Sequence, residues 1–149
     1  MHIFLTGPLQ SGKSTAIARY LAGRPEAPGG FRTYWDRGAG RLALELLETG
    51  EVLTVATMEP RGVKADRAAF DAAGERLLSA PAGRRALLLM DELGFLERCS
   101  PVFQRAVFTL LDGPTPVLGV LRPHEKSPFW GPVSRRADVR LLPLTVENR

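Results

Sequence analysis

A glycine-rich loop near the start of the chain constrains the fold more than any other feature. Residues 7–14 read Gly-Pro-Leu-Gln-Ser-Gly-Lys-Ser, and the pattern G-x-x-x-x-G-K-S/T is matched by Gly7, Gly12, Lys13 and Ser14. In this pattern the glycines let backbone N–H groups close around phosphate oxygens. The lysine reaches the β- and γ-phosphates, and the hydroxyl ligates Mg²⁺. The pattern requires a strand before the loop and a helix after it.

The flanking residues predict both of these elements. Residues 2–6 form a short apolar run that is typical of a buried strand. After the loop, apolar side chains recur at helical spacing until Gly23 and Pro25 provide a stop signal. We therefore predict a phosphate-binding loop, with Ser14 also holding Mg²⁺, that consists of Gly7, Pro8, Leu9, Gln10, Ser11, Gly12, Lys13, Ser14 and Thr15.

The rest of the chain alternates between strand and helix patterns. Turn signals separate β-leaning runs at 31–35, 41–47 and 52–57, which predicts an antiparallel β excursion after the first helix. Helical spacing continues over 65–79 and from Ser100 to Leu111, and the other expected strands are 86–90, 116–121 and 139–144. This order predicts an α/β fold of the phosphate-loop class, with a mostly parallel sheet flanked by helices. We expect one domain over residues 1–149.

Two acidic residues follow the expected strand at 86–90. Ligands of parallel α/β sheets bind at the carboxyl ends of strands, so Asp91 is predicted to hold Mg²⁺ and Glu92 to orient or deprotonate an attacking water. Transition-state charge in phosphoryl transfer is commonly stabilised by an arginine. Arg122, just past the strand at 116–121, is the preferred candidate on position, and Arg61 and Lys64 are second choices.

Composition narrows the remaining classes of function. The net charge of +4 comes from basic residues spread along the chain, which is a weak nucleic-acid signal, and we expect no nucleic-acid partner. The absence of a long apolar run predicts a cytoplasmic protein with no membrane partner.

His2 and His124 lack metal-ligand neighbours at useful spacing, so Mg²⁺ is the only metal implied. Four aromatic residues are interpreted as core or loop anchors more readily than as base-stacking groups: Tyr34, Trp35, Phe129 and Trp130.

Three further segments resemble one known family, the small phosphate-loop nucleoside-triphosphatases, sometimes called cancer-related or thermophilic nucleoside-triphosphatases. Gly30-Phe31-Arg32-Thr33 is similar to the family's Gly-Phe-x-Thr signature, and residues 90–97 resemble its Asp-Glu-x-Gly-x-x-Glu segment. The ending 144–149 resembles its Val-Thr-x-Glu-Asn-Arg finish. The resemblance implies slow, base-tolerant, Mg²⁺-dependent hydrolysis of ATP, GTP and other triphosphates to diphosphate and phosphate. It implies phosphate and Mg²⁺ binding by 12–15, and metal and water roles for Asp91 and Glu92.

Two other functions remain open at this stage. A nucleotide or small-molecule kinase would need a second substrate site and usually an arginine-bearing lid, for which the loop 123–136 is the candidate. A nucleotide-dependent binding or assembly module would use hydrolysis only to reset a partner interaction, and no protein partner can be named from the sequence. The acidic pair suits water activation better than acceptor binding.

Overall fold

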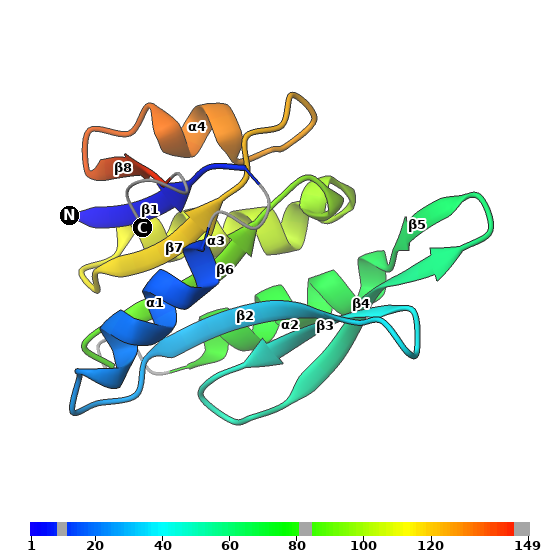
Figure 1. Ribbon diagram of the computed structural model, residues 1–149, viewed down its shortest axis with the longest axis horizontal. Coiled ribbons are helices and arrows are strands. Elements are labelled where there is room, and N and C mark those ends of the chain that lie inside the picture. Colours follow the sequence, from blue (N-terminus) through cyan, green and yellow to red (C-terminus); the bar gives the residue numbers. More distant parts are fainter. Residues whose placement is uncertain (9–11, 81–84, 145–149) are drawn as a thin grey trace.

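The computed structural model describes residues 1–8, 12–80 and 85–144 (Figure 1). Leu9, Gln10 and Ser11 of the predicted loop, and the family-like ending at 145–149, lie outside the described residues. The elements along the chain are β1 (His2–Thr6), α1 (Lys13–Ala22), β2 (Gly29–Asp36), β3 (Arg41–Leu46), β4 (Val52–Glu59), β5 (Gly62–Ala65), α2 (Arg67–Ser79), β6 (Leu88–Leu93), the 3₁₀ helix η1 (Leu96–Cys99), α3 (Pro101–Asp112), β7 (Val117–Leu121), α4 (Trp130–Ser134) and β8 (Val139–Pro143).

The described strands form one eight-stranded sheet in the order β5-β4-β3-β2-β6-β7-β1-β8. The five strands from β2 to β8 in this order pair in parallel, whereas β2, β3, β4 and β5 pair as successive antiparallel neighbours. The predicted fold class is therefore confirmed, and the antiparallel excursion extends the same sheet. In Figure 1 this extension projects to one side of the parallel half.

Helices cover both faces of the sheet. The α1 face is closed by a small cluster in which Ile17 contacts apolar side chains of β1, β6 and β7. The other face carries the larger core, to which α2, α3 and α4 contribute, with Phe103 in edge contact with both Phe31 and Phe70 at 5.4 and 5.3 Å between ring centroids. Within the part of the chain that the structure describes, no helix is both long and apolar enough to span a bilayer.

Four elements differ from the sequence prediction. β6 continues to Leu93, so Asp91 and Glu92 lie within the strand and do not follow it. β5, η1 and α4 were not expected, because the four residues of β5 are too few to show strand alternation and the four and five residues of η1 and α4 are too few to show helical spacing. α4 lies in the expected loop at 122–136, where Phe129 and Val133 are fully buried in the core.

Two glycines allow strands to approach closely near the centre of the sheet. Gly30 has φ +90°, and a Cβ there would stand 2.1 Å from the carbonyl oxygen of Leu89. A Cβ on Gly119 would stand 2.5 Å from the Phe4 ring and 2.6 Å from the Met90 carbonyl oxygen. Any larger residue would push β2 or β7 away from β6, which carries the acidic pair.

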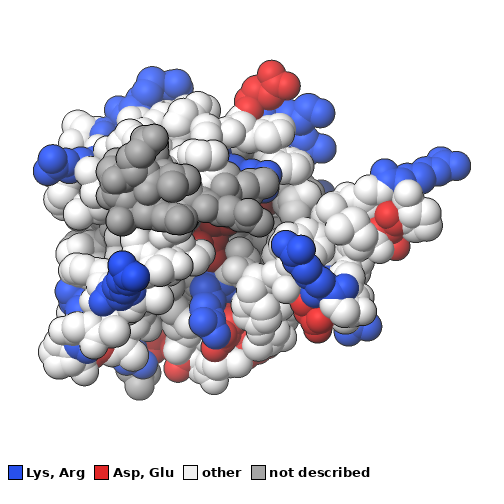
Figure 2. Space-filling model, in the orientation of Figure 1, with Lys and Arg blue, Asp and Glu red and all other residues white. Residues whose placement is uncertain are grey.

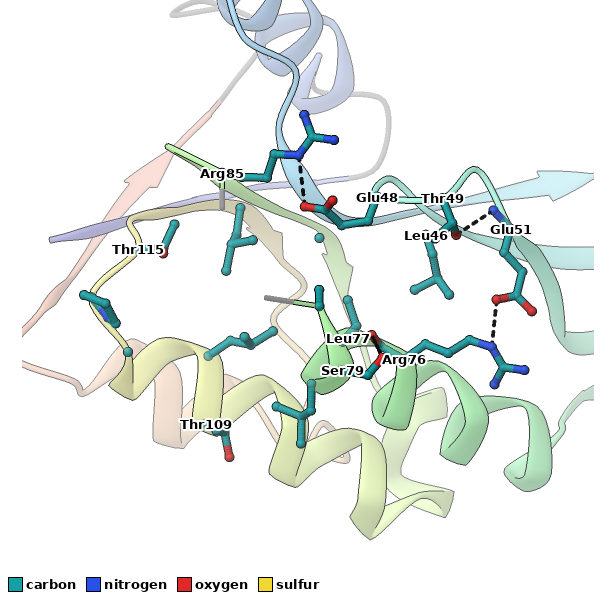
Figure 3. A pocket seen from close by; sticks show the side chains of 17 residues that line it. Leu46, Glu48, Thr49, Glu51, Arg76, Leu77, Ser79, Arg85, Thr109 and Thr115 are labelled. Carbon is teal, nitrogen blue, oxygen red and sulfur yellow. Dashed lines mark hydrogen bonds and ion pairs between the residues drawn. The ribbon is translucent and has the colours of Figure 1, made fainter. Parts of the chain in front are cut away.

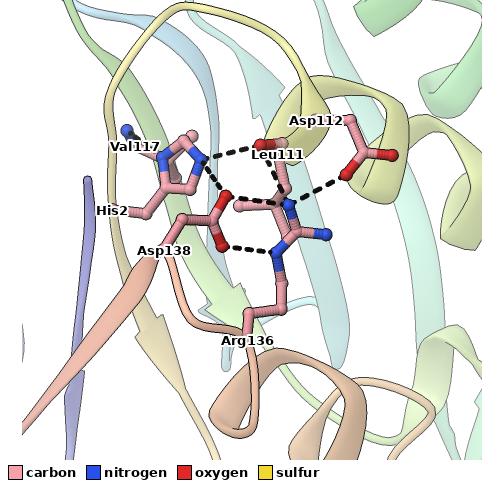
Figure 4. A network of polar contacts seen from close by, with 6 residues as sticks. All are labelled: His2, Leu111, Asp112, Val117, Arg136 and Asp138. Atoms are coloured by element: carbon pink, nitrogen blue, oxygen red, sulfur yellow. Dashed lines mark hydrogen bonds and ion pairs between the residues drawn. The ribbon is translucent and has the colours of Figure 1, made fainter.

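A polar network ties the beginning of β1 to the end of α3 (Figure 4). The buried His2 ring donates from Nε2 to the Leu111 carbonyl oxygen at 2.7 Å and accepts from the Val117 N–H at Nδ1 at 3.0 Å. Arg136 donates to both carboxylate oxygens of Asp138, at 2.8 and 2.9 Å. These hydrogen bonds give His2 a structural role, at the opposite end of β1 from the glycine loop.

Candidate functional site

The sheet topology brings the glycine loop and the acidic pair to one edge of the molecule. β7 lies between β1 and β6 and is parallel to both, so the carboxyl ends of the three strands lie side by side. Lys13 begins α1 after the loop that follows β1, Asp91 and Glu92 lie near the carboxyl end of β6, and Arg122 follows β7 directly. This edge is where ligands of open α/β sheets bind.

The Lys13 side chain folds back onto the first residues of the glycine loop. Its ammonium donates to the Gly7 carbonyl oxygen at 3.0 Å and to the Pro8 carbonyl oxygen at 2.6 Å. Burial lowers the pKa of Lys13, Glu92 and Asp91 raise it, and Arg122 lowers it. The lysine therefore lies within electrostatic reach of all three functional side chains predicted from β6 and β7.

The acidic pair is held from two neighbouring strands. On the β7 side, Arg122 Nη1 lies 3.9 Å from Glu92 Oε1. On the β2 side, the Thr33 hydroxyl donates to the Asp91 carbonyl oxygen and accepts from the Glu92 N–H, both at 3.3 Å. Thr33 belongs to the Gly-Phe-x-Thr segment that resembles the family signature, and the structure gives it a contact that the sequence did not reveal.

Burial changes the electrostatics of the acidic pair. It raises the pKa of Asp91 from 3.8 to about 6, an effect that Glu92 reinforces and that Arg32 and Lys13 oppose. It also raises the pKa of Glu92, against the effect of Arg122 and Lys13. The two carboxyl groups therefore hold protons more tightly than exposed ones do. A cation placed between the carboxyls and the loop would favour their charged forms.

Glu97 is a third carboxyl group at this edge, to which the sequence assigned no role. Its side chain is 6% exposed, and Oε2 accepts a hydrogen bond from the Gly94 N–H at 2.5 Å. Burial raises its pKa to about 7, against the backbone hydrogen bond from Gly94 and the charge of Arg122, which lower the pKa, while the charge of Glu92 also raises it. The glutamate in the Asp-Glu-x-Gly-x-x-Glu resemblance was the available signal, but its burial is a tertiary property.

Two hollows meet at these residues. The carboxylate cleft, a cavity of about 440 Å³, lies between the face of β2 and β3 and the end of β6, and its lining includes Ser14, Thr33, Trp35, Asp91, Glu92, Glu97 and Arg122. The α1 hollow, about 580 Å³, lies between α1 and β2 and shares Ser14, Thr33, Tyr34 and Asp91 with it. Figure 2 shows acidic side chains recessed near the centre of this face, while Lys and Arg are scattered over its surface.

A separate cavity of about 500 Å³ lies at the opposite edge of the sheet (Figure 3). Five leucine side chains contribute to its walls, and it is bordered by the ion pairs Arg85–Glu48 at 3.0 Å and Arg76–Glu51 at 2.7 Å. None of its described lining residues belongs to the glycine loop or the acidic pair. The candidate site is therefore the carboxylate cleft.

The second-choice cations and the four aromatic residues lie at different places relative to the acidic pair. Arg61 follows β4 and Lys64 lies on β5, so β2, β3 and β4 separate them from the acidic pair on β6. Arg32, which was not singled out, lies near enough to Asp91 to lower its pKa and pairs with Glu45 at 2.8 Å.

Phe129 is a core residue as interpreted, and Trp130 packs against the core. Tyr34 and Trp35, in contrast, are partly exposed and line the hollows at the site.

Comparison with known proteins places the chain in a family. A family described as NTPase matches residues 2–149, nearly the whole chain. The chain belongs to this NTPase family. The NTPase fold here is similar to the crystal structure of THEP1 from the hyperthermophile Aquifex aeolicus, with a TM-score of 0.80 and 22% sequence identity over 100% of this chain and 92% of that chain. No curated protein matches. The resemblance drawn from the sequence is confirmed, and membership of the NTPase family implies nucleotide binding and a nucleoside-triphosphatase type of function.

The buried carboxyl of this NTPase predicts a pH-dependent stability. The pKa of Glu97 rises from 4.5 in the unfolded chain to about 7 in the folded protein. Between these values the folded state holds a proton that the unfolded state has lost, so the free energy of unfolding falls as pH rises. From pH 5 to pH 8 the parent should lose about 2 to 3 kcal/mol more than Glu97→Gln, which cannot titrate.

Urea unfolding at the two pH values, with EDTA and without nucleotide, measures this difference. Glu75→Gln is the matched control, because Glu75 is exposed on α2. A stability gap between the parent and Glu97→Gln that stays constant with pH would show that Glu97 is ionised in the fold.

Proposed function

We propose that the protein hydrolyses nucleoside 5′-triphosphates, including ATP and GTP, to the diphosphate and phosphate, slowly, with Mg²⁺ and with little preference for the base. Water oxygen would bond to the γ-phosphorus while the bond from that phosphorus to the bridging oxygen breaks. The water proton would pass to Glu92. This assigns the catalytic roles to Lys13, Glu92 and Arg122.

One observation carries the proposal: opposite charges converge on the carboxylate cleft from separate elements. Lys13 from the loop and Arg122 from β7 both act on the pKa of Glu92, and Arg122 forms an ion pair with it. A γ-phosphate held by the loop would meet both cations and the carboxylate that handles water. Charge stabilisation and positioning are the main tasks in phosphoryl transfer.

The donor set at the cleft fits Mg²⁺. The Ser14 hydroxyl and the Asp91 carboxylate line both hollows, and hard oxygen donors of this kind are the ligands that Mg²⁺ prefers. Among the described residues, no group of three or more His, Cys, Asp or Glu side chains is placed to hold a metal ion. Mg²⁺ bound here would take its other ligands from phosphate oxygens and water. When bound, Mg²⁺ would neutralise charge on the β- and γ-phosphates. Ser14 and Asp91 would hold it.

Broad base tolerance would follow if the base lies in the hollow beside the start of α1. Its described lining residues are Gly12, Thr15, Ala16 and Arg19. Thr15 and Arg19 are exposed, and neither offers the fixed, buried donor and acceptor pair that reads the edge of a base. The triphosphate, which is common to all substrates, would supply most of the binding free energy.

Product analysis tests the proposal. The purified protein is incubated with Mg·ATP and then with Mg·GTP, without any acceptor, and the products are separated by ion exchange. Steady release of phosphate together with the diphosphate is the expected result. Release that needs an added acceptor and yields a phosphorylated acceptor would replace hydrolysis with a kinase reaction.

A kinase remains the second candidate because of the shape of the carboxylate cleft. Beyond Glu92 the cleft continues along apolar and aromatic side chains, among them Trp35, Leu42 and Val63, which water alone does not need. The expected lid argues the other way. The loop at 123–136 is anchored through the buried Phe129 and Val133, so opening it would disrupt the core around α3.

A further inference from the structure

We propose that Glu97 is a positioning residue. It acts through the backbone of Gly94 to hold Glu92 and Arg122 in position relative to each other at the phosphate end of the carboxylate cleft. The proposal rests on the proposed function of the same site. It gives a task to a buried carboxyl group that neither phosphate binding nor water activation uses.

The backbone of Glu97 is itself anchored by hydrogen bonds to the start of α3. It lies on η1, where the Ser100 N–H donates to its carbonyl oxygen at 3.0 Å, and the Gln104 side chain of α3 donates to the same oxygen at 3.0 Å. Ser100 caps α3 by accepting from the Phe103 N–H at 3.0 Å, and Phe103 is fully buried. The Glu97 carboxyl therefore projects from the central core toward the cleft.

Gly94 is held from two sides. Its N–H donates to Glu97 Oε2 at 2.5 Å, and its carbonyl oxygen accepts from the Ser127 hydroxyl at 3.0 Å. The Ser127 oxygen also accepts from the Phe129 and Trp130 N–H groups at 3.1 and 3.3 Å, which ties it to the start of α4. Both polar groups of the Gly94 backbone are thus bound by side chains from elements anchored in the core.

The hydrogen bonds of Gly94 to Glu97 and Ser127 form a clamp on its backbone. The residues next to Gly94 connect this clamp to Glu92 and Arg122. The Leu93 carbonyl oxygen accepts from the Arg122 N–H at 3.0 Å. The pairing of β6 with β7 passes from Asp91–Val120 to Leu93–Leu121, so it skips Glu92. The Glu92 backbone therefore has no partner residue in the β7 register. Thr33 binds its N–H, its side chain pairs with Arg122, and the Leu93–Gly94 segment follows it. If Gly94 shifts, Glu92 and Arg122 shift relative to each other.

The contact depends on side-chain length and not on charge, because either charge state of the carboxyl has an oxygen that can accept from the Gly94 N–H. Glutamine has the same length as glutamate and keeps a carbonyl acceptor. Aspartate keeps the charge but is one methylene shorter, which leaves the Gly94 N–H without its partner. The pair Glu97→Gln and Glu97→Asp therefore separates reach from charge.

Steady-state phosphate release from Mg·ATP by the full chain tests the proposal. Glu97→Ala and Glu97→Asp should lower kcat by about 10- to 100-fold, the usual consequence of misplacing catalytic groups by about 1 Å, and leave KM within about twofold. Glu97→Gln should restore kcat to within about threefold of the parent. Ser127→Ala, which removes the second side of the clamp, should lower kcat by about 3- to 10-fold.

Thermal unfolding and the stoichiometry of binding to a non-hydrolysable Mg·ATP analogue correct each rate for the fraction of folded protein. Glu75→Ala, on the exposed face of α2, is the matched control. The proposal is overturned if Glu97→Ala and Glu97→Asp turn over like the parent, or if Glu97→Gln is as slow as Glu97→Ala. Should the Glu97 variants not fold, an unchanged kcat in Ser127→Ala overturns it. A parent that releases no phosphate refutes the proposed function itself, which this comparison keeps distinct.

Discussion

Lys13→Ala is expected to abolish tight binding of the triphosphate. The Lys13 ammonium already spans the loop, donating to the Gly7 and Pro8 carbonyl oxygens. It lies close enough to Asp91 and Glu92 for their charges to act on its pKa. A phosphate held between the loop and the cleft would take charge-assisted hydrogen bonds from this ammonium, and alanine removes them. We expect the affinity to fall by at least about 100-fold, which corresponds to about 3 kcal/mol.

Calorimetric titration with a non-hydrolysable Mg·ATP analogue measures this loss. Lys64→Ala is the matched control, since Lys64 is an exposed lysine on β5, at the far edge of the sheet. Its affinity should stay within about twofold of the parent at moderate salt, because screening suppresses distant charge effects. Thermal unfolding must show that Lys13→Ala still folds. If Lys13→Ala binds the analogue as tightly as Lys64→Ala does, the ammonium is not part of the phosphate site.

The parts of the fold that could be predicted from the sequence are those set by local patterns. The first strand, the glycine loop and the first helix follow from the spacing of residues 2–22, and β1 and α1 lie there. The acidic pair was placed at a strand end because the preceding run is apolar without alternation, as befits a strand covered on both faces. That reasoning also brought Arg122 to the cleft, since parallel neighbours end at one edge.

The parts that could not be predicted depend on contacts between distant segments. Thr33 meets the Asp91–Glu92 backbone only because β2 pairs with β6 in a register that brings Arg32 opposite Asp91. Glu97 becomes a buried acceptor only when η1 packs against α3, and the family resemblance at 90–97 marks this residue without predicting its burial. The short α4 depends in the same way on Phe129 entering the core. Local patterns indicate the candidate residues, and tertiary contacts supply the groups that hold them in position.

Glu92→Gln is expected to bind the triphosphate and barely turn it over. The substitution keeps the shape of the side chain and removes its capacity to accept a proton. Burial raises the pKa of Glu92, which makes its carboxylate a stronger base than an exposed one. General-base catalysis contributes about 100- to 10,000-fold to a rate, so kcat should fall by at least about 100-fold. Affinity should change by less than about fivefold, because phosphate binding depends on the loop and Lys13.

Single-turnover hydrolysis of Mg·ATP and titration with its non-hydrolysable analogue separate the two effects in the same preparation. Glu75→Gln controls for the loss of one negative charge at an exposed position on α2. Because glutamine also removes the ion pair with Arg122, the pH dependence distinguishes the two causes. Loss of a base removes the acidic limb of the parent's pH–rate profile, whereas a freed arginine leaves that limb in place. Hydrolysis by Glu92→Gln at the parental rate would assign the water-handling role to another group, and Asp91, the other carboxyl with a raised pKa on β6, would be the next to test.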